Sequence, residues 1–272
     1  MSKSLALGRG FRVFPLRRET GDKPGVVTAW VLSVLLLLIW QGAAMFMPPY
    51  LLPSPVEVFP LIVELFSTRS FYYHSAMSLW HVAASITVAF AVSLVIAVLA
   101  HFQPVIRKAV YERLNLFLSS FSTIGWTFLA IMWFGLNEFT VIFAVAVTLT
   151  PFALSNLRTS LEELDSEAVE MAASFGRSRL RNLQLVILPL MVPYIFATLR
   201  ICLGVAWKVV LTAELFGGAS GLGYLVSRAR ANFEIPTLFA IFVVIVCFVY
   251  LTDKYVLDVI HRRLRKNYAA LG

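Results

Sequence analysis

The chain has 272 residues, of which 59% are hydrophobic and only 14% are charged, and its mean hydropathy is +0.81. An average soluble domain is about 45–50% apolar and about 25% charged, so these few charges cannot cover the surface of a water-exposed globule of this size. The composition excludes a soluble fold and predicts an integral membrane protein whose outer surface contacts lipid.

Six stretches of the chain are long and apolar enough to cross a bilayer core, which needs about 20 such residues in a helix. In chain order they are Val26–Met47, Leu79–Phe102, Leu114–Leu136, Phe139–Leu157, Leu190–Ala213 and Ile235–Thr252. Only the fifth contains charged residues, Arg200 and Lys208. We therefore expect an all-α membrane protein with about six transmembrane helices in residues 26–260, between basic tails at residues 1–25 and 261–272.

The basic residues follow this topology. The formal net charge is +8, and most Lys and Arg residues lie in the two tails and in every second connection. The positive-inside rule then places both termini in the cytoplasm. Because membrane topology accounts for the charge, we expect no nucleic-acid partner.

Two connections on the opposite side of the membrane have distinctive residues. Pro48–Pro55 contains four prolines and begins a polar stretch that runs to about Ser78, which predicts a short helix at the outer interface. Between the last two spans, Gly217–Gly223 contains four glycines, whose permissive backbone predicts a tight re-entrant bend.

The third cytoplasmic segment, Arg158–Leu188, carries the most information. Acidic residues come first and basic residues follow, which is the order that a helix macrodipole favours. Ser166 is a candidate N-cap and Gly176 a candidate helix stop. The pattern predicts a short amphipathic helix, a glycine hinge, and a second, basic helix that leads into the fifth span through Pro189.

This segment resembles the signature loop of the inner-membrane permeases of binding-protein-dependent ABC importers. That signature has Glu-Ala-Ala, three residues, Gly, nine residues, then an aliphatic residue, any residue, Leu and Pro. The matching positions are Glu170, Met171, Ala172, Gly176, Val186, Leu188 and Pro189, with Met171 replacing the first alanine.

The resemblance implies a type I ABC importer-like permease in the bacterial inner membrane. The implied partners are a second permease copy or a similar chain, two cytoplasmic ABC ATPase subunits, an extracytoplasmic solute-binding protein and membrane lipid. The residues implied to couple the permease to the ATPases are Ser166, Glu167, Glu170, Ala172, Ala173, Gly176, Arg177, Leu188 and Pro189.

The chain contains no G-x-x-x-x-G-K-[ST] phosphate loop. We therefore expect that it is not itself an enzyme and binds no cofactor directly, with ATP and Mg used by the partner subunits. The histidines show no metal-ligand spacing, and we assign none of them a metal.

Within the permeases, the chain looks most like the nitrate, sulfonate and taurine branch. The matching segments are Leu52–Pro55, Trp133–Gly135, Leu199-Arg200, Ala213-Glu214 and Gly221–Gly223. Departures lie at Thr87, where the branch usually has arginine, and at Ser122–Trp126, where it has prolines. The resemblance implies a small organic or inorganic anion as solute, such as a sulfonate, taurine or nitrate, while the departures leave a different solute open.

The candidate pathway or gate residues are Trp126, Arg200, Trp207, Lys208 and Glu214. Charges inside a span are rare and costly, which makes Arg200 and Lys208 functional candidates. Arg200 fits a structural role at a helix end, whereas Lys208 either favours an anionic solute or extends its ammonium to the interface. For Glu214 we expect surface pairing with Arg228, Arg230 or the docked binding protein. The tryptophans either face the pathway or anchor at the interface.

Two other functions remain open. An ion-coupled secondary transporter would need acidic or polar residues in its spans to bind the coupling ion. A membrane-embedded enzyme or scaffold would not need the registered glycine and proline of the third cytoplasmic segment.

Overall fold

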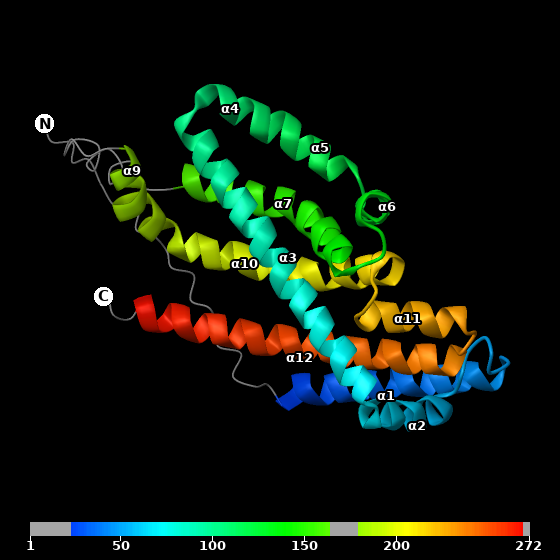
Figure 1. Ribbon diagram of the computed structural model, residues 1–272. Helices are drawn as coiled ribbons and strands as arrows, with labels where there is room; N and C mark the ends of the chain where they lie inside the picture. The colour runs from blue at the N-terminus through cyan, green and yellow to red at the C-terminus, as the bar shows by residue number, and fades with distance from the viewer. Residues whose placement is uncertain (1–22, 164–178, 269–272) are drawn as a thin grey trace, which may run out of the picture.

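The computed structural model describes residues 23–163 and 179–268, and every regular element in these ranges is helical. Long helices lie side by side, with shorter helices at both ends of the bundle (Figure 1). The predicted all-α fold is therefore confirmed.

Three long helices form the centre of the bundle: α3 (Arg69–Phe102), α7 (Glu138–Glu162) and α10 (Leu188–Gly217). Their common core combines small side chains with a few large ones, among them Ala89, Val145, Leu149, Ala206 and Trp207. Small residues allow helices to approach closely where lipid supplies no hydrophobic driving force for association.

Helices α3 and α7 run parallel to each other with a constant offset in sequence. The Ser85 hydroxyl donates to the carbonyl of Ile142 at 3.4 Å, and the Ser93 hydroxyl donates to the carbonyl of Thr150 at 3.1 Å. Each pair is separated by 57 residues. Hydroxyl groups that bond across neighbouring helices help fix the register of the pair.

The predicted third span is not one continuous helix. Helix α4 (Pro104–Lys108), the π-helical turn η1 (Ala109–Leu114) and α5 (Asn115–Ser120) lead to α6 (Thr123–Phe134), and the two halves meet at 82°. Ser122 causes part of this break, because its hydroxyl caps α6 by accepting from the Gly125 amide at 3.3 Å. The indole of Trp126 then donates back across the break to the carbonyl of Leu118 at 3.2 Å.

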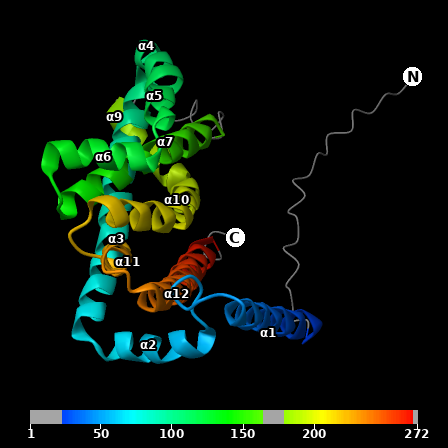
Figure 2. The same ribbon diagram turned by 90° about the vertical axis from the view of Figure 1, so that its right-hand side faces the viewer.

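The first two helices lie at the edge of the bundle. Helices α1 (Lys23–Met45) and α2 (Pro55–Ser67) lie beside α12 (Ile235–Tyr268), and α1 stands away from the central helices (Figure 2). The Trp40 indole donates to the carbonyl of Pro53 at 3.1 Å, and its ring lies 6.2 Å from that of Phe239. A cleft of about 500 Å³ lies between α1 and α12.

Helix α2 begins as the sequence predicts, directly after the proline-rich stretch. The Ser54 hydroxyl accepts from the Glu57 amide at 3.3 Å, and the Glu57 carboxylate accepts from the Ser54 amide at 3.0 Å. This capping box satisfies two backbone donors that a helix end leaves without partners.

Four helices in the described ranges are long and apolar enough to span a membrane. They cover Arg69–His101, Glu138–Glu162, Leu185–Gly217 and Ile235–Thr252, and the bent pair counts as a fifth if it is one span. Residues Val31–Met45 of α1 form a shorter apolar helix. The second span differs from the prediction, because α3 already begins at Arg69 rather than near Leu79.

The fifth span begins as the basic end of the third cytoplasmic segment predicts. Helix α9 (Arg179–Asn182) and the π-helical turn η2 (Leu183–Ile187) continue into α10, whose first two residues are Leu188 and Pro189. Pro189 has no amide hydrogen to donate, and the helix changes from π-helical to α-helical directly before it. The other predicted coupling residues, Ser166, Glu167, Glu170, Ala172, Ala173, Gly176 and Arg177, lie outside the described residues.

Candidate functional site: a polar cluster and a cationic helix face

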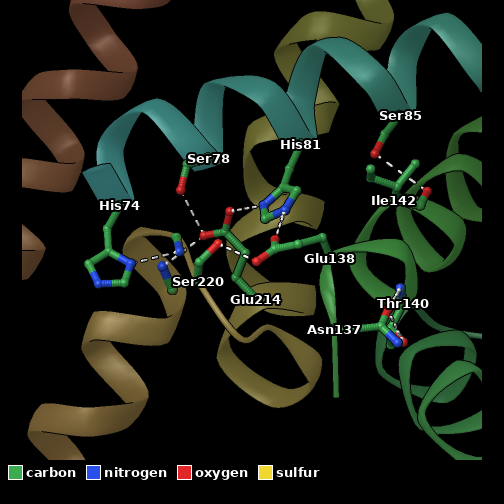
Figure 3. A network of polar contacts seen from close by, with 12 residues as sticks. His74, Ser78, His81, Ser85, Asn137, Glu138, Thr140, Ile142, Glu214 and Ser220 are labelled. Atoms are coloured by element: carbon green, nitrogen blue, oxygen red, sulfur yellow. Dashed lines mark hydrogen bonds and ion pairs between the residues drawn. The ribbon is translucent and has the colours of Figure 1, made fainter. Parts of the chain in front are cut away.

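A cluster of polar side chains joins α3, α7 and α10 near the bend that follows α10 (Figure 3). Helix α3 contributes His74, Ser78 and His81, which lie on one face because they are spaced by four and three residues. All three side chains are buried. Residue Glu138 at the first position of α7 and Glu214 near the end of α10 complete the cluster.

The Glu214 side chain is fully buried, with 0% of its surface exposed. Its Oε1 lies 2.7 Å from Nδ1 of His81, and its Oε2 accepts from the Ser78 hydroxyl at 2.9 Å and from the Gly223 amide at 2.9 Å. A buried carboxylate is costly unless hydrogen bonds and a counter-charge replace its water shell. These contacts provide the hydrogen bonds, and His81 provides the counter-charge when its ring is protonated.

His81 bridges two carboxylates. Its Nδ1 faces Glu214, and its Nε2 contacts Oε2 of Glu138. A neutral imidazole has one N–H donor, and an ionised carboxylate can only accept. Two hydrogen bonds therefore require a second proton on this trio, either on the ring or on one carboxyl group. In this arrangement, which we call the His81 clamp, either the imidazole ring is protonated or one of the two carboxyl groups is.

The glycine-rich bend closes over the cluster. The Ser220 hydroxyl donates to Oε1 of Glu138 at 2.7 Å, and the Gly221 amide donates to Nδ1 of His74 at 3.2 Å. Gly221 has a φ of +107°, a conformation that other residues rarely adopt. Helix α11 (Leu222–Ala231) begins directly after it, and the Leu222 amide donates to the Ser78 hydroxyl at 2.7 Å.

The expectation that Glu214 pairs at the surface with Arg228 or Arg230 is wrong. The residue faces inward because the bend brings Gly223 and α3 onto its carboxylate. The histidines lack metal-ligand spacing, and spacing along the chain does not connect His81 with Glu138. The sequence contains two signals: three polar residues at helical spacing in a largely apolar helix, and an Asn-Glu pair that starts a later span.

A second feature is a face of α10 that points away from the bundle core. Ala197, Arg200, Ile201, Gly204 and Lys208 are all exposed and follow one another at intervals of one to four residues along one face. A Cβ atom added to Gly204 would meet no atom within 4 Å. The opposite face of α10 packs into the core. This cationic helix face is therefore open in the single chain.

The two cations on this face differ in depth. At about 1.5 Å rise per residue, Lys208 lies roughly 13 Å from the last residue of α10, and Arg200 lies about 12 Å further along. The Lys208 ammonium forms no hydrogen bond or ion pair with residues 23–163 or 179–268. Lys208 therefore lies within an apolar span and has no counter-charge among the described residues.

The two tryptophans among the candidates lie inside the bundle. Trp207 is 1% exposed and its ring packs edge-on against Phe248 at 5.7 Å, while Trp126 is 6% exposed and braces the break before α6. The Nε1 of Trp207 has no hydrogen-bond partner within the described ranges. Neither indole reaches the open face of α10 in the single chain.

Among known proteins, the chain is similar to permease proteins of transport systems. SsuC of Bacillus subtilis, whose name assigns it to aliphatic sulfonate transport, is 28% identical over 92% of this chain and 91% of its own length. The taurine transport system permease protein TauC of Escherichia coli is 27% identical over 79% of this chain and 78% of its own length.

Solved structures show the same fold. A chain of the methionine ABC transporter MetNI, in inward-facing conformations, matches with a TM-score of 0.58 and 17% identity, over 70% of this chain and 96% of that one. The fold is that of a type I ABC importer permease. The family described as "Binding-protein-dependent transport system inner membrane component" matches residues 91–266, which include the last part of α3, all of α7 and all of α10. The chain thus belongs to the inner-membrane components of binding-protein-dependent transport systems, as a multi-pass translocation subunit.

Proposed function

We propose that this permease is the membrane subunit of an ATP-driven importer of small anions, such as a sulfonate, taurine or nitrate, in the bacterial inner membrane. In this proposal a second copy or a similar chain completes the translocation pathway. Two ABC ATPases bind on the cytoplasmic side, and a solute-binding protein docks outside. The predicted loop from Glu170 to Pro189 transmits the ATPase movement to α10.

The single observation that carries the proposal is the position of Lys208. A lysine within a span is costly against lipid and is found facing a bundle interior or a water-filled cavity. Lys208 lies on the open face of α10, and the part of the chain that the structure describes offers its ammonium no partner. We infer that in the assembled transporter this face borders the pathway rather than lipid.

The positive charge of Lys208 also supports an anion as the transported solute. An ammonium along a pathway lowers the energy of a passing anion, especially where the surrounding medium is apolar. Arg200 on the same face places a second positive charge further along α10. The names of SsuC and TauC refer to sulfonate and taurine transport, and both solutes carry a sulfonate group.

The test is uptake into vesicles that contain the permease together with its cognate ATPase and solute-binding protein. We expect ATP-dependent uptake of radiolabelled taurine, an alkanesulfonate or nitrate. Lys208→Met should lower the uptake rate roughly tenfold, which corresponds to the loss of one charge-assisted interaction. Lys208→Arg should retain most of the rate.

The matched control is Lys254→Met, because Lys254 is also an exposed lysine of a spanning helix but lies on α12. It should transport normally. If Lys208→Met also transports normally, the lysine only extends to the interface and the assignment of this face to the pathway fails. Uptake driven by an ion gradient without the ATPase would instead favour a secondary transporter.

A further inference from the structure

A polar pocket lies at the other end of the bundle from the His81 clamp, where α3 and α7 end and η1 passes over them. Its volume is about 160 Å³. The polar side chains that line it are His101, Arg107, Tyr111, Arg158 and Glu162. By the distribution of Lys and Arg along the chain, this end faces the cytoplasm, at the level of the lipid headgroups.

The pocket has more positive than negative charge. Nη2 of Arg107 and Nε of Arg158 both donate to the same oxygen, Oε1 of Glu162, at 2.9 and 3.0 Å. Two guanidinium groups thus share one carboxylate, and the trio keeps an excess of one positive charge. Each guanidinium carries five N–H donors. Within residues 23–163 and 179–268, the hydrogen bonds to Glu162 use one donor of each.

A ring contact helps to hold one of the two cations in place. The Arg158 guanidinium lies over the Tyr111 ring, with its Cζ 4.8 Å from the centroid. Tyr111 belongs to the π-helical turn η1, a type of turn that is rare and is found frequently at functional sites. Arg107 is 55% exposed and Arg158 43%, so a ligand from the headgroup layer can reach both.

We propose that this pocket binds a phosphate group, with Arg107 and Arg158 as its ligands and Glu162 as the internal anion that phosphate displaces. Guanidinium forks match the oxygens of phosphate, and basic pockets between helices on the cytoplasmic side suit the headgroups of anionic lipids. The phosphate belongs either to a phospholipid such as phosphatidylglycerol or to the free ion. The proposal goes beyond the transport function and does not depend on which solute is carried.

Binding at this pocket has a consequence for Glu162. The carboxylate lies at the last residue of α7, four residues before Ser166, the first of the predicted coupling residues, and two guanidiniums hold it. A phosphate group that takes over those guanidiniums releases the carboxylate. Occupancy of the pocket is therefore linked to the conformation of the end of α7.

Native mass spectrometry of the assembled transporter tests the lipid source. The complex is released from nanodiscs that contain phosphatidylglycerol and phosphatidylcholine, and the retained lipid is counted. We expect retained phosphatidylglycerol in the unmodified protein and a roughly tenfold loss in Arg107→Gln and Arg158→Gln. Thermal unfolding of lipid-depleted protein in inorganic phosphate, against chloride at equal ionic strength, tests the free ion.

The variant Glu162→Gln separates a binding site from a structural ion pair. If phosphate competes with the carboxylate, Glu162→Gln raises retention, whereas a purely structural cluster would lose retention and stability together. Arg113→Gln is the matched control, because Arg113 is an exposed arginine on the same π-helical turn outside the pocket. It should bind normally.

Each outcome decides the proposal. Stabilisation by inorganic phosphate without retained phosphatidylglycerol identifies the free ion as the ligand and keeps the site. No response in either arm overturns the proposal. So does an equal loss in Arg113→Gln and Arg107→Gln, which would indicate diffuse attraction to the membrane surface, or reduced binding in Glu162→Gln.

Discussion

Gly221 lies directly against the buried carboxyl group of Glu214, and a Cβ atom on Gly221 would stand 2.2 Å from the Glu214 Cδ. The bend after α10 can close over this carboxylate only because the residue has no side chain. The positive φ of Gly221 adds a second reason for glycine at this position.

Gly221→Ala should therefore destabilise the fold by at least about 2 kcal/mol, from backbone strain and from displacement of the carboxylate. The measurement is thermal unfolding of the purified protein in detergent. Gly204→Ala is the control, because its Cβ meets nothing within 4 Å and alanine favours a helix. An equal loss of stability in both variants would contradict the close packing of the bend.

The two carboxylates that contact His81 should differ in their effect on stability. Glu214 is fully buried, whereas 36% of the Glu138 side chain is exposed. We expect Glu214→Gln to lower the free energy of unfolding by about 3 kcal/mol, because it breaks a buried charged network. Glu138→Gln should cost less than about 1 kcal/mol, because water screens that pair.

A double-mutant cycle checks that His81 is the shared partner. If the clamp exists, combining His81→Gln with Glu214→Gln should cost clearly less than the sum of the single changes. Additive costs would show that the two residues act independently, and the clamp would then have to be abandoned.

Weakening the contact at Trp40 should loosen helix α1 and leave the central bundle intact. Trp40→Phe removes the indole hydrogen bond to Pro53, which is worth about 1 kcal/mol, and keeps an aromatic ring near Phe239. Hydrogen exchange should become faster in α1 and stay unchanged in α3 and α7. Trp133→Phe is the comparison, since that ring is largely exposed and lies on α6. Faster exchange throughout the protein would argue that α1 is part of the core.

A further prediction concerns Gly176, which belongs to the predicted coupling loop from Glu170 to Pro189 and lies outside the described residues. Gly176→Pro should uncouple ATP hydrolysis from uptake or prevent assembly with the ATPases, because proline cannot adopt the backbone of a helix-ending glycine. Gly176→Ala should have a smaller effect. The measurement is the ratio of solute taken up to ATP hydrolysed, and a normal ratio in Gly176→Pro would count against the coupling role.

The sequence predicted the elements that depend on local pattern. The apolar run Phe139–Leu157 lies within α7, and Ile235–Thr252 lies within α12, because lipid solvation requires such runs to be helical. The break of the third run was missed, since an absence of charges does not reveal that Ser122 caps a new helix. Serine is a preferred N-cap residue, but its presence alone does not predict a break in an apolar run of this length.

The polar cluster could not be read in the same way. His81 and Glu214 are separated by 133 residues, and their contact depends on how α3 packs against α10 and on the turn at Gly221. Periodicity places His81 on a face of its helix, but it does not say which helix covers that face. The position of Glu214 at the start of the outer bend favoured surface pairing, because carboxylates are rarely buried without partners.

The constant offset between α3 and α7 limits how this protein can change shape. Sliding one helix past the other by a single residue would break the Ser85 and Ser93 hydrogen bonds and the His81 contact to Glu138 together, since all three pairs are 57 residues apart. These two helices should therefore travel as one rigid unit during the transport cycle. The hinges of the cycle then have to lie elsewhere, at the ends of α10 and at the boundary with the neighbouring subunit.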